Sequence, residues 1–201
     1  NLSEKDQEVD GLKRHIQILK EEPKLKILVT GANGYLGQGI VRSILNNGHC
    51  VVATDFNTQF VDERAERIAC NLFEVDNPYS FFGEPDVLLH LAWRDGFVHY
   101  SSAHIDDLPK HYAFIKKMVD GGIQQVAVMG SMHEIGFFEG SINESTPCHP
   151  TTPYGIAKNA LRDLTQMICK QKNIVFQWYV AIILLVILSL AVQYSQRLQR
   201  P

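Results

Sequence analysis

Cysteine is scarce in this 201-residue sequence, and its spacing excludes two common structural roles. Cys50, Cys70, Cys148 and Cys169 lie far apart and form no C-x-x-C pair. A disulfide framework or a structural zinc site would need a denser pattern than this. We therefore expect a reduced, cytoplasmic protein in which the cysteines are small core residues.

The sequence also lacks any strong excess of one charge. Its formal net charge is −3, and the basic residues are scattered along the chain. A nucleic-acid-binding protein would need a basic stripe to neutralise the phosphate backbone. We therefore expect no nucleic-acid partner. We recognise no secretory signal peptide, although the sequence opens on Asn1 rather than Met.

No metal-ligating pattern is present either. His99, His104 and His111 are separated by five and seven residues, which fits no single helix face. Neither a cysteine nor a paired carboxylate joins them, so we predict no metal site.

A glycine-rich turn organises the chain. Lys24 to Gly37 reads KLKILVTGANGYLG, a short apolar run followed by a G-x-x-G-x-x-G turn. Apolar residues at helical spacing follow it as far as Leu45. Glycines between a strand and a helix allow a pyrophosphate to approach the backbone, where its charge can rest on the helix N-terminus. A structural βα turn is the alternative.

An acidic residue supports the dinucleotide interpretation. The apolar run His49 to Ala53 predicts a second strand, and Asp55 follows it, 24 residues after Gly31. A carboxylate at this position can accept hydrogen bonds from an adenosine ribose, which favours NAD over its 2′-phosphorylated form. A turn aspartate at a strand end is the alternative.

Strands and helices alternate through most of the chain. The expected elements are an N-terminal amphipathic helix over 1–22, further strands at 67–72, 87–92, 125–129 and 174–178, and helices at 108–119 and around Leu161. Nearly continuous apolar strands that alternate with helices indicate a parallel sheet covered on both faces. The predicted fold is a doubly wound α/β domain over 23–178.

A second polar motif lies further along the chain. Tyr154 and Lys158 form a Y-x-x-x-K at the start of a predicted helix, so their side chains share one helix face. A nearby cation would favour the phenolate and lower the tyrosine pKa towards the range of a general base. Ser131 ends the fifth predicted strand, at the sheet edge where parallel α/β folds bind ligands.

Together these motifs resemble the extended short-chain dehydrogenase/reductases, the NAD-dependent epimerase/dehydratase family. The resemblance covers about Lys24 to Trp178, including the segment HLAW (His90 to Trp93) and Gly136, five residues after Ser131. It implies a Rossmann fold and reversible oxidation of a nucleotide-linked sugar. By this resemblance Ser131, Tyr154 and Lys158 are catalytic, and Lys158 also holds the nicotinamide ribose.

The resemblance further implies a set of NAD-binding residues. They are Gly31, Asn33, Gly34, Tyr35, Leu36, Gly37, Asp55, Asn71, Leu72, Leu91, Ala92, Trp93, Tyr154 and Lys158.

Several residues depart from the family pattern. Asn71 stands where an aspartate is frequent, and Trp93, Arg94 and Asp95 replace small residues after the fourth strand. The Asn-x-x-Gly-Thr pattern of the next helix is absent, and Asp107 falls near that asparagine. We interpret His133 and Glu134 as part of an exposed polar loop, with substrate contact as the alternative.

The stretch 179–201 has an apolar character that the family does not share. Three interpretations compete: a membrane tail anchor, a buried helix, and the product of a reading-frame shift after Trp178. The run is short for a bilayer span, and a helix apolar on every face needs covering. Restoring one base after the Trp178 codon can yield the Leu-Arg pair that the family has here. We therefore favour a frameshift, which would leave this chain without its substrate lobe and with impaired activity.

The expected function is that of an NAD-dependent nucleotide-sugar epimerase or dehydratase. The alternative is a non-catalytic dinucleotide-binding module that acts as a redox sensor or interaction partner. The expected partner is a nucleotide-sugar substrate rather than a membrane, and a homodimer is left open as the assembly.

Overall fold

The computed structural model describes residues 23–143 and 145–181. The amphipathic helix expected over 1–22 and most of the apolar tail, 182–201, lie outside the described residues. Within the described part, no helix is both long enough and apolar enough to cross a bilayer.

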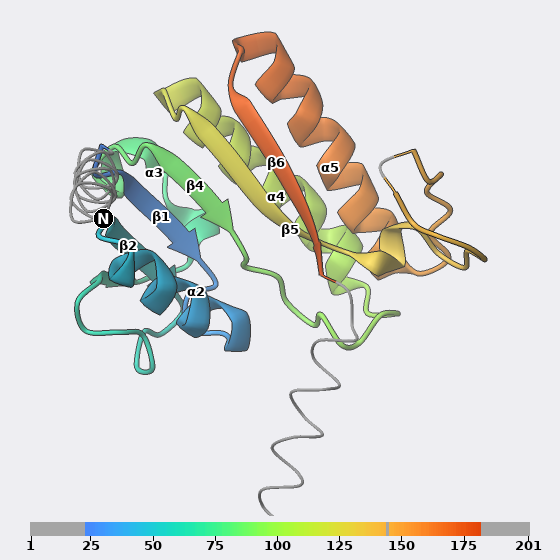
Figure 1. The fold of residues 1–201 in the computed structure, drawn as a ribbon, viewed down its shortest axis with the longest axis horizontal. Helices are drawn as coiled ribbons and strands as arrows, with labels where there is room; N and C mark the ends of the chain where they lie inside the picture. The colour runs from blue at the N-terminus through green and yellow to red at the C-terminus, as the bar shows by residue number, and fades with distance from the viewer. Residues whose placement is uncertain (1–22, 144, 182–201) are drawn as a thin grey trace, which may run out of the picture.

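Six parallel strands form one sheet in the order β3-β2-β1-β4-β5-β6 (Figure 1). Their bounds are β1 Lys26–Thr30, β2 Cys50–Asp55, β3 Glu66–Ala69, β4 Val87–His90, β5 Gln125–Ser131 and β6 Val175–Ala181. The strand order reverses between β1 and β4, so this pair marks the switch point at which doubly wound sheets bind ligands. The predicted doubly wound parallel fold is confirmed.

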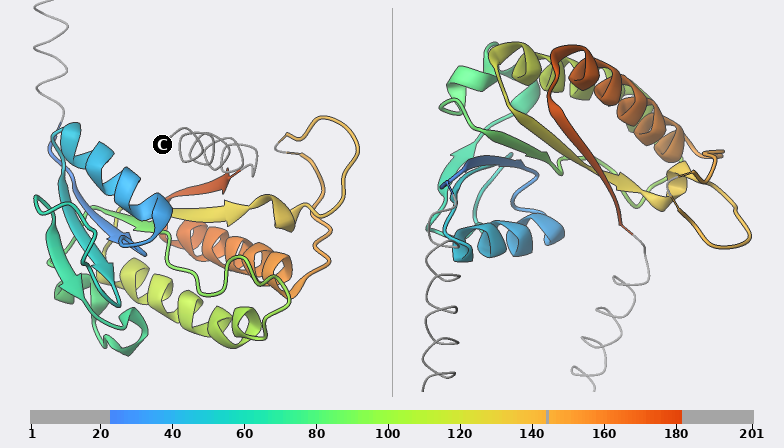
Figure 2. Two further views of the ribbon diagram at one scale, coloured as in Figure 1. Left: turned by 90° about the horizontal axis from the view of Figure 1, so that it is seen from below. Right: turned by 45° about the horizontal axis from the view of Figure 1, so that its top comes forward.

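Helices cover both faces of this sheet (Figure 2). They are α2 Tyr35–Asn46, α3 Pro78–Phe81, α4 Ala103–Gly121 and α5 Pro153–Lys172, with short 3-10 turns η1 Leu72–Glu74 and η2 Met132–Glu134. Helix α2 lies on one face, and α4 and α5 lie side by side on the other.

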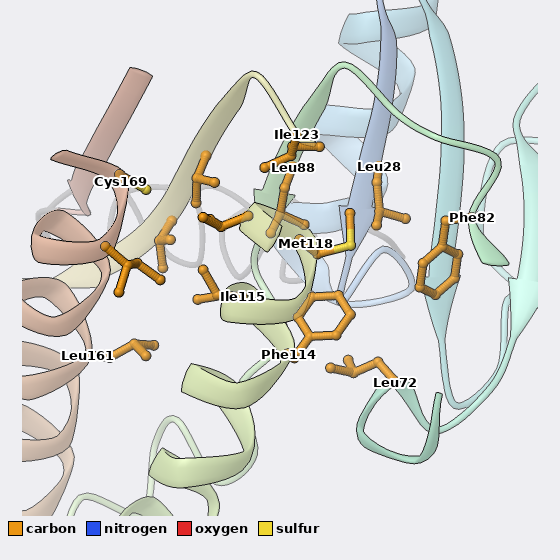
Figure 3. Close-up of a cluster of buried hydrophobic side chains, with 14 of the residues drawn as sticks. Leu28, Leu72, Phe82, Leu88, Phe114, Ile115, Met118, Ile123, Leu161 and Cys169 are labelled. Carbon is orange, nitrogen blue, oxygen red and sulfur yellow. The ribbon is translucent and has the colours of Figure 1, made fainter. Parts of the chain in front are cut away.

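Side chains along each strand point alternately to the two faces of the sheet, and this divides the core into two layers. In β1, Leu28 packs with the α4 and α5 side, in the cluster drawn in Figure 3. Its neighbours Ile27 and Val29 pack with Val41 of α2 on the opposite face. Successive strand residues point to opposite faces. An unbroken apolar run is therefore what a strand covered on both sides requires.

Several strand boundaries differ from the sequence expectation: β4 ends at His90 instead of Ala92, and β5 continues to Ser131 instead of ending at Met129. The third strand ends at Ala69 instead of continuing to Leu72, because the Asn71 side chain accepts the Phe73 N–H and starts η1. The sixth strand continues beyond Trp178 to Ala181, pairing in register with β5 as far as Ser131. The start of the atypical stretch is therefore part of the sheet.

Candidate active site

The glycine turn follows β1 and passes close to the end of β4. Gly31 has a φ of 68°, and a Cβ there would lie 2.7 Å from the Ala92 amide nitrogen. A Cβ on Gly37 would lie 2.3 Å from the Gly31 carbonyl oxygen. Only glycine allows both the left-handed backbone and these close approaches. The turn therefore brings its own backbone close to the start of α2, as a pyrophosphate site requires.

Helix α2 begins without a capping side chain. Its N-cap residue is Gly34, and its first turn contains no acidic residue. A helix N-terminus of this kind favours an anion through its N–H groups and its dipole.

Asp55 orders the turn from the end of β2. Its Oδ2 accepts the Asn33 N–H at 3.0 Å, and its Oδ1 accepts the Phe56 N–H at 2.8 Å. The Asn33 side chain then accepts the Phe60 N–H and donates to Asn57. The predicted ribose-binding carboxylate is thus fixed beside the glycine turn.

A cleft of about 530 Å³ opens along this edge of the sheet. The predicted cofactor residues that line it are Gly31, Gly34, Asp55, Asn71, Leu72, Leu91, Ala92 and Trp93. Asn33, Tyr35, Leu36, Gly37, Tyr154 and Lys158 are not part of its lining. The predicted cofactor set did not include seven further lining residues, among which Arg94 comes from the loop after β4 and Asp107, Lys110 and His111 come from α4; the others are Phe56, Cys70 and Phe73.

Tyr154 lies at the start of α5, which Thr152 caps by accepting the Gly155 N–H. Burial raises the pKa of the Tyr154 phenol. A side-chain hydrogen bond from Ser131 lowers this pKa, and the charge of Glu134 raises it. The structure therefore brings Ser131 and Tyr154 together, as expected for residues that share a reacting oxygen.

Lys158 is nearly inaccessible to solvent and interacts differently from the sequence expectation. Its Nζ donates to the Met129 carbonyl at 2.7 Å and lies 4.0 Å from the centroid of a Trp93 ring. Burial lowers the pKa of Lys158 to about 7, against the opposing effect of the Glu134 charge. Burial raises the Tyr154 pKa, and Lys158 is not among the groups that shift it, so the expected effect of Lys158 on Tyr154 stays a prediction.

The expectation of an exposed loop was wrong for Glu134. This side chain is only 1% exposed, and its Oε1 accepts the Ser131 N–H at 2.5 Å. Its Oε2 accepts the Trp178 indole N–H at 2.8 Å. Burial raises the Glu134 pKa, against these hydrogen bonds and the nearby cations. Its interpretation as a loop residue failed because the sequence does not show that β6 brings Trp178 alongside η2.

Aromatic rings and histidines surround Tyr154. The His99 ring stacks on Tyr154 with centroids 5.3 Å apart, and His133 lies 3.9 Å from His99. Trp93 donates its indole N–H to His104 Nδ1 at 3.0 Å. These histidines come from the 94–102 loop, α4 and η2. Their spacing in the sequence therefore did not predict that they meet around Tyr154. Within 23–143 and 145–181, no group of acidic, histidine and cysteine side chains could hold a metal ion.

Asp107 joins two cations on the wall of the cleft. It accepts from Arg94 Nε at 2.9 Å and from Lys110 Nζ at 2.7 Å. Burial raises the Asp107 pKa, but the hydrogen bonds from Lys110 and Arg94 outweigh this effect and the pKa falls. Asp107, which falls near the asparagine of the family's Asn-x-x-Gly-Thr pattern, is therefore an ionised carboxylate held by two basic side chains.

Comparison with known proteins extends this picture. The chain is 41% identical over 143 residues to dTDP-6-deoxy-L-talose 4-dehydrogenase (NAD(+)) of Aggregatibacter actinomycetemcomitans; the match covers 69% of this chain and 53% of that protein. The chain spans about half the length of the curated relatives that it matches.

Solved structures share the fold. UDP-glucose 4-epimerase of Thermotoga maritima with UDP-glucose superposes with a TM-score of 0.66 at 19% identity, covering 77% of this chain and 54% of that one. The Bordetella bronchiseptica enzyme WbmG in complex with NAD gives 0.60 at 19%, covering 73% and 51%. The profile of the NAD dependent epimerase/dehydratase family matches residues 27–185. The chain belongs to this family.

Proposed function

We propose that this chain forms the NAD-binding half, with the proton-transfer groups, of an enzyme that oxidises or epimerises a nucleotide-linked sugar. The observation that carries the proposal is the arrangement at one sheet edge. The glycine turn and Asp55 lie at the carboxyl ends of β1 and β2, and Ser131 lies at the end of β5 in the same parallel sheet. Parallel α/β sheets bind their ligands at this edge.

The residues fit a dinucleotide. Gly31 and Gly37 leave no room for a Cβ, and α2 starts without a side-chain cap. We assign the pyrophosphate to this turn and the adenosine ribose to Asp55, with Asn71 and Leu72 on the adjoining wall of the cleft. NAD, when bound, supplies a hydride acceptor. The remaining residues of the predicted set, from Asn33 to Leu36 and from Leu91 to Trp93, are proposed to shape the same site.

Ser131, Tyr154 and Lys158 supply the proton chemistry in this proposal. In this role the Tyr154 phenolate takes the proton of a sugar hydroxyl and becomes the phenol, and the Ser131 hydroxyl holds that oxygen beside it. The hydrogen bond between the Ser131 and Tyr154 side chains supports these roles. Lys158 has a pKa of about 7, so its amine can gain or lose a proton near neutral pH. The resulting change in charge would alter how readily Tyr154 ionises.

The substrate class rests on the relatives. Their names specify sugars linked to dTDP or UDP, so we propose a nucleoside diphosphate sugar as the substrate here. A homodimer and a cytoplasmic location remain predictions. We also retain the division into an N-terminal extension (1–22), an NAD-binding domain (23–178) and an atypical tail (179–201), although the first tail residues complete β6.

Cofactor preference tests the proposal. Titration of this chain with NAD and NADP by calorimetry should show tighter binding of NAD by at least about tenfold, since a 2′-phosphate would meet the Asp55 carboxylate. Asp55→Asn should narrow this preference. Asp62→Asn is the matched control, because Asp62 pairs with Arg64 outside the cleft lining. Equal or tighter binding of NADP would contradict the assignment of Asp55.

A further inference from the structure

Three buried polar side chains form a continuous hydrogen-bonded row from the glycine turn to the cleft wall. Thr30 Oγ1 lies 2.8 Å from His90 Nδ1, and His90 Nε2 lies 2.8 Å from His111 Nδ1. Thr30, His90 and His111 are each at most 2% exposed. We call them the histidine row. Sequence motifs did not reveal it, because its members come from β1, β4 and α4.

The proton positions in this row follow from its contacts. Thr30 Oγ1 accepts the Ala92 N–H at 3.3 Å, so the Thr30 hydroxyl proton needs a separate acceptor. In the described part of the chain, His90 Nδ1 is the acceptor within reach. A neutral imidazole that accepts at Nδ1 carries its proton on Nε2. His90 therefore donates to His111 Nδ1, which leaves the His111 proton on Nε2.

Both rings are held neutral. Burial, together with the positive charges of Lys158 and Lys110, lowers the pKa of His111 to about 3. Burial, followed by His111 and Lys158, lowers the pKa of His90 well below its ordinary value. Each ring therefore has one N–H donor and one acceptor at neutral pH.

His111 presents its remaining nitrogen at the proposed NAD cleft. The residue lines the cleft between Phe73 and Trp93, with ring centroids 4.8 Å and 4.4 Å away. Within the described residues, Nε2 has no hydrogen-bond partner, whereas Nδ1 is taken by His90. On the same wall, Arg94 and Lys110 already pair with Asp107. His111 Nε2 is not among the fully buried polar atoms that lack a partner, so this nitrogen is accessible from the cleft and can donate to a ligand acceptor there.

We propose that His111 is a cofactor-positioning residue: its Nε2–H donates a hydrogen bond to a phosphate or hydroxyl oxygen of the bound dinucleotide, in a tautomer fixed by Thr30 and His90. This inference rests on the proposed function, since it takes the cleft as the NAD site. It adds a neutral donor to that site, which orients the ligand without adding charge. Because the row begins at Thr30, the same contacts link the donor to the residue before the glycine turn.

The first arm of the test needs no ligand. Long-range proton–nitrogen NMR spectra of the uniformly ¹⁵N-labelled chain at pH 7 report which ring nitrogen of each histidine carries the proton. His111→Phe and His90→Gln variants assign the signals. We expect Nε2–H tautomers at both His90 and His111. A proton on Nδ1 of His111, or a charged ring, would overturn the inference.

The second arm adds NAD. Binding should shift the His111 Nε2–H signal, and His111→Phe, which keeps a flat ring against Trp93, should weaken NAD binding about 2- to 10-fold. His111→Gln should restore part of the loss, because its amide can donate from a similar position. If His111→Phe unfolds, as circular dichroism would show, His111→Gln and the NAD-induced shift still decide the point. His49→Phe, at the opposite strand end, should leave the affinity unchanged.

The outcomes separate the two proposals. Undiminished affinity in a folded His111→Phe variant, or NAD binding without a shift of the His111 Nε2–H signal, overturns the role of His111 and leaves the NAD cleft intact. Failure of the unaltered chain to bind NAD overturns the NAD cleft and with it the donor role, while the tautomers measured without ligand still report on the row itself.

Discussion

Tyr154 is the residue whose removal should separate chemistry from binding. Tyr154→Phe deletes only the hydroxyl that pairs with Ser131. In a full-length version of the protein that is active, we expect the turnover number to fall by about 10²–10⁴-fold, the usual contribution of general acid–base catalysis. NAD affinity should change little. Steady-state kinetics and calorimetry measure the two quantities, and Tyr79→Phe on α3 is the control. Near-normal turnover would refute the catalytic role.

Lys158→Ala should damage both properties. Its ammonium contacts the Met129 carbonyl and the Trp93 ring, and we propose that it also supports Tyr154 and the nicotinamide ribose. Removing it leaves a buried carbonyl and a cavity, so weaker NAD binding should accompany the loss of turnover. A variant with lost turnover but unchanged NAD affinity would restrict Lys158 to the proton-transfer step.

Glu134 holds the end of β5 in place. Glu134→Gln would turn one acceptor oxygen into an NH₂ group that faces either the Ser131 N–H or the Trp178 indole N–H. An unmatched buried donor costs about 1–3 kcal/mol, so the midpoint of urea unfolding should fall accordingly. Exposed Glu139→Gln is the matched control. Equal midpoints for both variants would show that Glu134 contributes no net stability through these hydrogen bonds.

At the scale of the element, α2 offers two glycines in contrasting surroundings. A Cβ on Gly37 would overlap the Gly31 carbonyl, whereas Gly39 has open space around it. Gly37→Ala should therefore push α2 away from the turn, destabilise the fold by about 1–3 kcal/mol and weaken NAD binding. Gly39→Ala should raise stability by about 0.5–1 kcal/mol. Thermal unfolding and NAD titration test both; a harmless Gly37→Ala would contradict the close-packing argument.

The strand and helix assignments from sequence succeeded where apolar runs were long. β1, β4 and β5 are largely buried on both faces, so their central residues, 27–29, 87–89 and 126–129, form continuous apolar runs. The third strand lies at the sheet edge, and its burial pattern is mostly exposed. A strand sequence that mixes polar and apolar residues does not show where the strand begins and ends. The Asn71 side chain caps η1, so β3 ends earlier than its apolar residues suggested.

At the scale of the whole molecule, the neutral histidines should make stability depend on pH. An unfolded histidine has a pKa near 6.5, whereas the folded state lowers the pKa of His111 to about 3 and that of His90 well below its ordinary value. Below pH 6.5 the unfolded chain therefore binds protons that the folded chain does not. The free energy of unfolding should fall by up to about 1.4 kcal/mol per pH unit for each histidine.

Urea unfolding between pH 7.5 and 5 measures this dependence. His133, whose pKa burial also lowers, acts in the same direction. Lys158, whose folded pKa of about 7 lies below that of an unfolded lysine, acts in the same direction at the upper end of this range and adds little below about pH 6, where both states bind its proton. His111→Phe should reduce the change in the free energy of unfolding per pH unit. Stability that stays flat across this range would show that the histidine row takes up protons in the folded state.

The fold class and the positions of the glycine turn, Asp55, Ser131, Tyr154 and Lys158 along the chain could be predicted from the sequence alone. These features are local: a strand, a turn and a helix start are specified by neighbouring residues, and parallel topology follows from their alternation. Only the tertiary structure decided what surrounds them. Glu134 meets Trp178, and His111 meets His90, through contacts between distant segments. Burial at those contacts also sets the pKa values, because desolvation depends on the packing of the entire fold.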